Sequence, residues 1–144
     1  MSLFGGLEIS ASGLTAERLR MDVTAENLAN AQTTRGADGQ PYRRKEVILQ
    51  EVPGSFGATL SKAMGAGQVG GVQVAAVVED QTPLKRVYDP GHPDADAQGY
   101  VSMPNVDTVT EMVDLIGASR AYEANVTAMQ AAKQMFARTL ELLR

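Results

Sequence analysis

Residues 108–144 read TVTEMVDLIGASRAYEANVTAMQAAKQMFARTLELLR and contain no proline. Large apolar side chains recur in this stretch at alternating spacings of three and four residues, which is the spacing of the contact positions in a heptad repeat. At 1.5 Å per residue, a helix of about 36 residues would be roughly 54 Å long, which is long for one small domain. We therefore predict a helix over residues 105–144 that packs along a partner. Its predicted contact positions, which we call the C-terminal seam, include Leu115, Tyr122, Val126, Met129, Phe136, Leu140 and Leu143.

The beginning of this predicted helix has the spacing of a capping box. In that motif a Ser or Thr hydroxyl and a Glu carboxylate three residues later bind free backbone N–H groups of the first turn reciprocally. Thr108 and Glu111 have this spacing. The sequence therefore predicts that both side chains cap the helix.

The N-terminal segment, residues 1–34, shows the same alternation. Its predicted contact positions, the N-terminal seam, include Phe4, Leu7, Leu14, Met21 and Leu28. The glycines of this segment each cost roughly 1 kcal/mol relative to alanine in an isolated helix, so we expect the helix to depend on packing for its stability. The periodicity alone fits an ordinary amphipathic core helix equally well. Matched seams at both ends of the chain predict that the two terminal helices pack antiparallel within one subunit.

The middle of the chain, residues 35–104, changes to glycine, proline and short runs of β character. Val72 to Val78 alternate in the manner of a strand, and Val47 to Leu49, Leu84 to Tyr88 and Tyr100 to Met103 are shorter candidates. Residues 52–71 carry six glycines and one proline, and we interpret them as a flexible loop. The predicted fold is therefore α+β. Two long terminal helices form an antiparallel, coiled-coil-like pair with a small β-rich insert between them. The predicted domain boundaries are 1–34, 35–104 and 105–144.

Composition excludes several classes of function. The net charge of −4 argues against a protein that coats nucleic acid, which needs a basic surface. The chain has no cysteine, so disulfides and thiolate chemistry are excluded. We expect no membrane-spanning segment, and the N-terminus lacks the basic and apolar regions of a cleaved secretory signal.

We predict no catalytic, cofactor or metal site. Residues 65–70, GAGQVG, match a dinucleotide fingerprint by letter, but they lack the strand before and the helix after that the phosphate site requires. His92 is the only histidine and stands beside prolines and aspartates, which is typical of a rigid turn rather than of a ligand cluster. Arg43, Arg44 and Lys45 form the only basic cluster, and we interpret it as a solvated strand end.

Three parts of the sequence together resemble the flagellar rod and hook family. The first is ISASGLTAERLRM at residues 9–21, followed by ENLANAQTT at residues 26–34. The second is DPGHPDAD at residues 89–96, followed by GYV at 99–101 and MPNV at 103–106, and it is most similar to proximal-rod members. The third is EMVDLI at 111–116, RAYEANV at 120–126 and AKQM at 132–135.

The resemblance implies a non-enzymatic structural subunit of the bacterial flagellar basal body. Such a subunit would leave the cell through the flagellar type III export channel without signal cleavage and would polymerise in the periplasm. Its partners would be copies of itself, other rod proteins, the basal-body base and the export apparatus, and its contacts would transmit torque. The signature positions that the resemblance identifies are Asn27, Leu28, Ala29, Asn30, Pro104, Asn105, Glu111, Met112, Arg120, Tyr122 and Asn125.

Three other interpretations are compatible with parts of the sequence. Another rod or hook subunit would share the terminal signatures. A cytoplasmic coiled-coil adaptor would share the seams, and cell fractionation would distinguish it from an exported subunit. A metal-dependent enzyme built on His92 would contain bound metal after purification.

Overall fold

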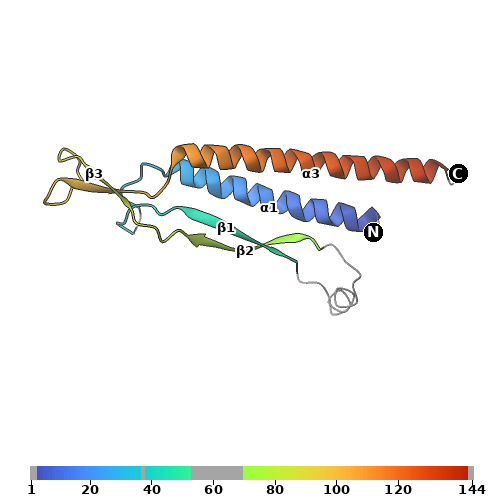
Figure 1. The fold of residues 1–144 in the computed structure, drawn as a ribbon, viewed down its shortest axis with the longest axis horizontal. Helices are drawn as coiled ribbons and strands as arrows, with labels where there is room; N and C mark the ends of the chain where they lie inside the picture. The colour runs from blue at the N-terminus through green and yellow to red at the C-terminus, as the bar shows by residue number, and fades with distance from the viewer. Residues whose placement is uncertain (1–2, 37, 53–69, 143–144) are drawn as a thin grey trace. The chain divides into compact units, whose positions relative to one another are not determined.

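The computed structural model describes residues 3–36, 38–52 and 70–142, and it confirms the α+β fold (Figure 1). Two long helices, α1 and α3, lie at the two ends of the chain, and four short strands lie between them. The elements are, in order, α1 (Leu3–Ala29), β1 (Lys45–Glu51), β2 (Val72–Glu79), β3 (Lys85–Tyr88), β4 (Tyr100–Met103) and α3 (Thr108–Leu142). Most of the loop predicted over residues 52–71 lies outside the described residues.

The chain divides into two compact units, and each takes part of both helices. Unit 1 contains residues 1–19, 48–76 and 118–144, and unit 2 contains residues 20–47 and 77–117. In both units the α1 and α3 segments lie side by side and run in opposite directions (Figure 1). The antiparallel helix pair is thus present in each unit. The predicted domains, 1–34, 35–104 and 105–144, are consecutive segments of the chain, whereas each unit combines separate segments. The predicted domains remain a prediction.

Short strands form two separate two-stranded sheets. One contains β1 and β2, and backbone hydrogen bonds flank it at Val52–Gly71 and at Arg44–Asp80. The other pairs β3 with β4 antiparallel, with Val87 opposite Val101. Along β4, Val101 is buried and Met103 half-buried whereas Tyr100 and Ser102 are exposed, so one face of this strand packs against unit 2.

The most buried positions of α1 keep heptad spacing but differ in phase from the predicted seam. They are Ala16, Val23, Thr24 and Asn27. The predicted seam positions Leu7, Leu14, Met21 and Leu28 are only half-buried, and the side chain of Phe4 lies outside the described residues. The small Ala16 allows the neighbouring segments to approach closely, whereas Asn27 is buried because its side chain is hydrogen-bonded on both its oxygen and its nitrogen.

On α3 the centre of the buried face also lies beside the predicted seam. Ala118 and Glu111 are its most buried residues. Leu115, Tyr122, Val126 and Met129 are half-buried, whereas Phe136 and Leu140 are exposed. Leu143 lies outside the described residues.

In unit 1 the helices approach closely at Gly13. A Cβ atom at this position would lie 3.0 Å from Nδ2 of Asn125, so a larger residue would press against α3. The same segment also receives β2, because the backbone N–H of Val72 donates to Oγ of Ser12 at 3.0 Å. Among the described residues, no helix is both long enough and apolar enough to span a membrane.

Candidate functional site

A buried pair of polar side chains joins the two helices in unit 2. Asn27 of α1 and Glu111 of α3 are each 1% exposed, and Nδ2 of Asn27 donates to Oε2 of Glu111 at 3.0 Å. Burying a carboxylate is costly unless it is paired and hydrogen-bonded. Such a group in the centre of a helix contact therefore requires further partners.

Arg44, which directly precedes β1, supplies the opposite charge. Its Nε donates to Oε1 of Glu111 at 2.5 Å, and Nη2 lies 3.6 Å from Oδ2 of Asp114. Nη1 also pairs with the exposed Glu46. Desolvation by burial lowers the pKa of Arg44, but the hydrogen bonds and charges of Glu111 and Glu46 outweigh it and raise the pKa overall. The guanidinium is therefore held in its charged form at the end of the helix pair.

Asn27 also fixes the backbone that leads into β1. Its Nδ2 donates to O of Lys45 at 2.8 Å, and its Oδ1 accepts from N of Lys45 at 2.9 Å. The Tyr42 hydroxyl donates to the same Oδ1 at 2.9 Å. The side chain of Asn27 thus pairs with the backbone of Lys45 as a neighbouring strand would, and it ties α1 to β1.

Asn105 completes the connection from the α3 side. Its Oδ1 accepts from N of Arg44 at 2.8 Å, and its Nδ2 donates to O of Asp80 at 3.1 Å and to Oγ1 of Thr82 at 2.9 Å. Pro104, directly before it, is fully buried. We call Asn27, Arg44, Asn105 and Glu111 the junction, because they join α1, the start of β1, the end of β2 and the start of α3.

The junction corrects two predictions from the sequence. Glu111 does not cap its helix, because its carboxylate faces Asn27 and Arg44. The cap is Asp107, whose Oδ1 accepts from N of Val109 at 3.0 Å. The basic cluster is not simply a solvated strand end, because the Arg44 side chain is only 19% exposed and pairs with a buried acid. The predicted seam does not include Glu111, and apart from the capping-box spacing only the resemblance singled it out.

Tyr42 makes the stability of the junction sensitive to alkaline pH. Burial, followed by the negative charges of Glu26, Glu111 and Glu79, raises the pKa of Tyr42 to about 12. A raised folded-state pKa means that the contribution is fully present below pH 10 and is lost as the pH rises through about 12.

We expect the free energy of unfolding to fall between pH 10 and 12 by about 1 kcal/mol through Tyr42, after allowance for partial solvent screening. Tyr42→Phe should remove that part of the decline. Urea titrations of both proteins at several pH values measure it. Identical pH slopes in the two proteins would contradict the assignment.

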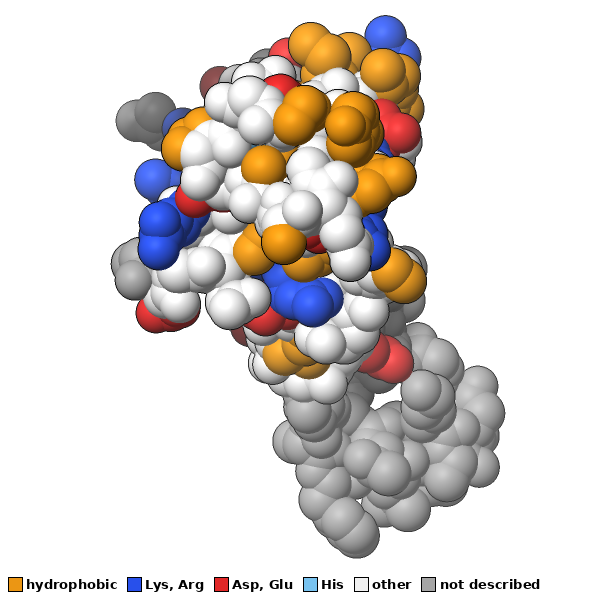
Figure 2. Space-filling model, turned by 90° about the vertical axis from the view of Figure 1, so that its left-hand side faces the viewer, with side chains coloured by type: hydrophobic (Ala, Val, Ile, Leu, Met, Phe, Trp, Pro, Cys, Tyr) orange, Lys and Arg blue, Asp and Glu red, His pale blue; other side chains and the backbone are white. Residues whose placement is uncertain are grey.

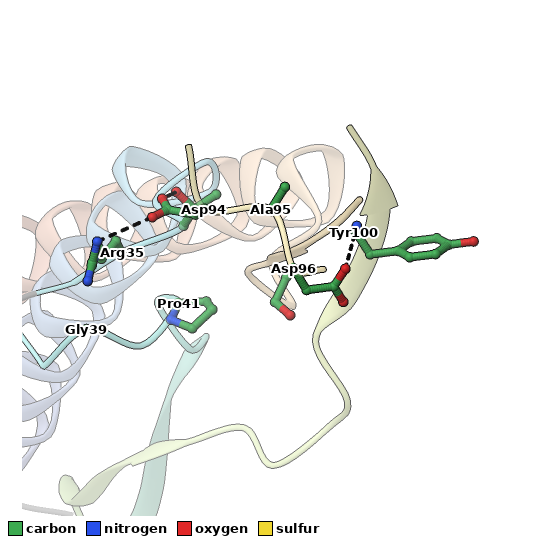
Figure 3. Close-up of a pocket in the computed structure, with 9 residues that line it drawn as sticks. Arg35, Gly39, Pro41, Asp94, Ala95, Asp96 and Tyr100 are labelled. Atoms are coloured by element: carbon green, nitrogen blue, oxygen red, sulfur yellow. Dashed lines mark hydrogen bonds and ion pairs between the residues drawn. The ribbon is translucent and has the colours of Figure 1, made fainter. Parts of the chain in front are cut away.

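A polar pocket of about 310 Å³ lies elsewhere in unit 2 (Figure 3). Its lining carboxylates are already satisfied. Oδ2 of Asp94 accepts from Thr34 at 2.9 Å, and Arg35 lies 3.6 Å from Oδ1 of Asp94. The backbone N–H of Tyr100 lowers the pKa of Asp96, whose other oxygen pairs with Arg86 at 2.7 Å. The negative charges of both lining carboxylates are therefore balanced by neighbouring arginines.

His92 lies in the turn next to this pocket. Its Nδ1 accepts from N of Asp94 at 3.1 Å, and O of His92 accepts from N of Ala95 at 3.1 Å. Within residues 3–36, 38–52 and 70–142, no group of three or more His, Asp or Glu side chains could hold a metal ion.

The first two turns of α3 carry a row of apolar side chains that point away from the junction. Val109, Met112, Val113 and Ile116 recur at one helical face and are between 54% and 69% exposed. We call them the outer stripe. On the face of the molecule that Figure 2 displays, hydrophobic side chains, in orange, gather mainly in the upper part. Single exposed apolar side chains are common on protein surfaces, whereas a contiguous apolar patch of this kind marks an interaction surface.

The junction brings together Asn27, Asn105 and Glu111 among the signature positions, and the buried Pro104 directly precedes Asn105 in the same unit. Leu28 and Asn30 lie half-buried beside Asn27, whereas Ala29, Met112 and Arg120 are exposed. Tyr122 and Asn125 are half-buried on the α3 segment of unit 1. Arg44 belongs to the junction and Tyr42 donates a hydrogen bond to it, but neither is among the signature positions.

Two protein-family models match the chain at its ends. Residues 7–37 match the flagella basal body rod protein model, and residues 97–142 match the C-terminal model of the flagellar basal body rod FlgEFG protein. The matches contain Asn27 on one side and Asn105 and Glu111 on the other. Both models point to the class of flagellar basal-body rod proteins.

Several curated relatives match along nearly the whole chain and have the name flagellar basal-body rod protein FlgC. The relative from Bacillus subtilis is 51% identical over 148 residues, covering 99% of both chains. Those from Escherichia coli O6:H1 and Borreliella burgdorferi are 49% and 45% identical, and each match covers at least 98% of both chains. The chain therefore belongs to the family of flagellar basal-body rod proteins FlgC and is a structural subunit of the rod.

Proposed function

We propose that this subunit builds the proximal part of the rod and transmits torque through contacts made by the outward faces of its terminal helices. The observation that carries the proposal is the outer stripe, together with exposed Met135 and Leu140 farther along α3. Apolar side chains at interfaces are covered by partners in the assembled state. Contacts that repeat without closing a ring generate helical assemblies, which suits a rod.

The proposal includes the subunit's route and partners. The subunit passes through the flagellar export apparatus without signal cleavage and assembles in the periplasm. There it contacts copies of itself, other rod proteins and the basal-body base. It performs no catalysis. Full-length similarity to rod proteins and an internally satisfied polar junction support this assignment.

A strain that lacks the gene tests the proposal directly. We expect that strain to build no rod and to be non-motile, and we expect the restored protein to cofractionate with purified basal bodies. Electron microscopy of those basal bodies should place an epitope on the subunit in the proximal rod. Recovery of the protein in the cytoplasm, with normal basal bodies in the deletion strain, would support an adaptor instead.

We also expect the two units to differ in order before assembly. Among the described residues of unit 1, those buried most completely are Ala16 and Ala118. Unit 2 buries the larger Val23, Val101 and Val106 together with Asn27 and Glu111. A helix with little buried surface is marginal in water. Unit 1 should therefore gain much of its helical order when a neighbouring subunit covers it, as in coupled folding and binding.

Hydrogen exchange of the free monomer measures this difference within single helices. Amides of residues 3–19 and 118–142 should exchange quickly, while those of residues 20–29 and 108–117 in the same helices should be protected. Strong protection along the whole length of both helices at monomeric concentration would show that assembly does not order unit 1.

A further inference from the structure

The buried face of α3 in unit 2 is less apolar than the face it exposes. Toward the junction lie Glu111, which is 1% exposed, and Leu115, which is half-buried, while the Asp114 side chain lies at the edge of this face and is 44% exposed. Outward lies the outer stripe, with four large apolar side chains. At about 100° per residue, Glu111 and Val113 are separated by about 200°, so the two faces lie on opposite sides of the helix.

Hydrophobic burial alone would select the opposite orientation. A helix buries its apolar stripe against its neighbours unless another interaction prevents this. If α3 turned its outer stripe inward, Glu111 would point to solvent, and Arg44 and Asn27 would lose a partner at 2.5 Å and 3.0 Å respectively. The observed orientation is therefore the one that satisfies these polar groups.

Asp114 adds to the same preference. It lies on the Glu111 side of α3, and its Oδ2 is 3.6 Å from Nη2 of Arg44. One guanidinium thus engages two carboxylates of the same helical face. Buried ionic groups contribute little net stability compared with apolar replacements, but they can determine which of two competing arrangements forms.

We propose that the Arg44–Glu111 ion pair, supported by Asn27, is a specificity device that selects which face of α3 is buried and thereby keeps the outer stripe exposed. This selection is a property of the single subunit and does not depend on the proposed function. In an assembly its consequence is that the stripe remains available at the surface.

The absence of cysteine from the sequence allows a direct test with single reporter cysteines in the full chain. Ile116→Cys reports the outer face and Leu115→Cys the inner face. In the parent background, maleimide should modify position 116 much faster than position 115. In Arg44→Ala/Glu111→Ala the ratio of the two rates should fall at least tenfold, because the outer stripe now competes for burial.

Two further variants distinguish face selection from a loss of structure. Arg86→Ala/Asp96→Ala removes a largely exposed ion pair of the same unit and should leave the ratio unchanged. Adding Val109→Thr and Val113→Thr to the Arg44→Ala/Glu111→Ala protein should restore the parental ratio, because the outer face then loses its apolar advantage.

An unchanged ratio in Arg44→Ala/Glu111→Ala would overturn the proposal. Loss of cooperative unfolding in that protein, with no recovery in the threonine variant, would overturn it as well, since the pair would then hold unit 2 together rather than select its face.

Discussion

Replacement of Glu111 by leucine is expected to lower the free energy of unfolding by about 3 kcal/mol. Removing one partner of a buried ion pair typically costs about 3–5 kcal/mol, because the other charge remains without compensation. The Arg44 side chain keeps 19% exposure and can still reach Glu46, so we expect the low end of that range. Asn27 also loses an acceptor for Nδ2. Urea unfolding followed by circular dichroism measures the change.

Glu46→Leu is the matched control for this prediction. It makes the same chemical change in a second carboxylate that pairs with Arg44, but Glu46 has a side chain that is 51% exposed. Exposed ion pairs contribute about 0–1 kcal/mol, so the control should lose no more than that. Equal losses in the two variants would mean that burial of Glu111 does not determine the energy of the pair.

The α+β fold could be predicted from the sequence because the three-and-four spacing of the two ends differs clearly from the alternation of the β-rich insert. A three-and-four alternation predicted both helices, and α3 begins at Thr108 within the predicted range. The phase of the contact face was not accessible in the same way. Large apolar residues define the most visible heptad of α1, whereas the structure buries Ala16 and Asn27. Close packing favours the small Ala16, and hydrogen bonds allow Asn27 to be buried, but a pattern based on hydrophobicity gives little weight to either residue.

The contacts of the junction could not be predicted from local sequence patterns. Resemblance pointed to Asn27, Asn105 and Glu111, but it gave no reason why these positions belong together. The reason is long-range: Arg44 is 67 positions from its partner Glu111, and no local pattern predicts such a contact. Glu111 also fitted a capping box by spacing, and local spacing cannot reveal that Asp107 takes that role.

A charge at Leu140 is expected to prevent assembly while leaving the free subunit intact. Leu140 is 52% exposed on α3, so Leu140→Asp should change the stability of the monomer by no more than about 0.5 kcal/mol. If a neighbouring subunit covers this position in the rod, an unpaired carboxylate is buried there at a cost of several kcal/mol. Each 1.4 kcal/mol is a factor of ten in affinity, so a cost of about 3 kcal/mol lowers incorporation roughly 100-fold. Motility should be lost, and the exported protein should be missing from purified basal bodies.

Gln134→Asp is the matched control for this prediction. It adds the same charge at an exposed polar position of the same helix and should preserve swimming. Normal swimming of the Leu140→Asp strain would show that this part of α3 faces solvent in the assembled rod.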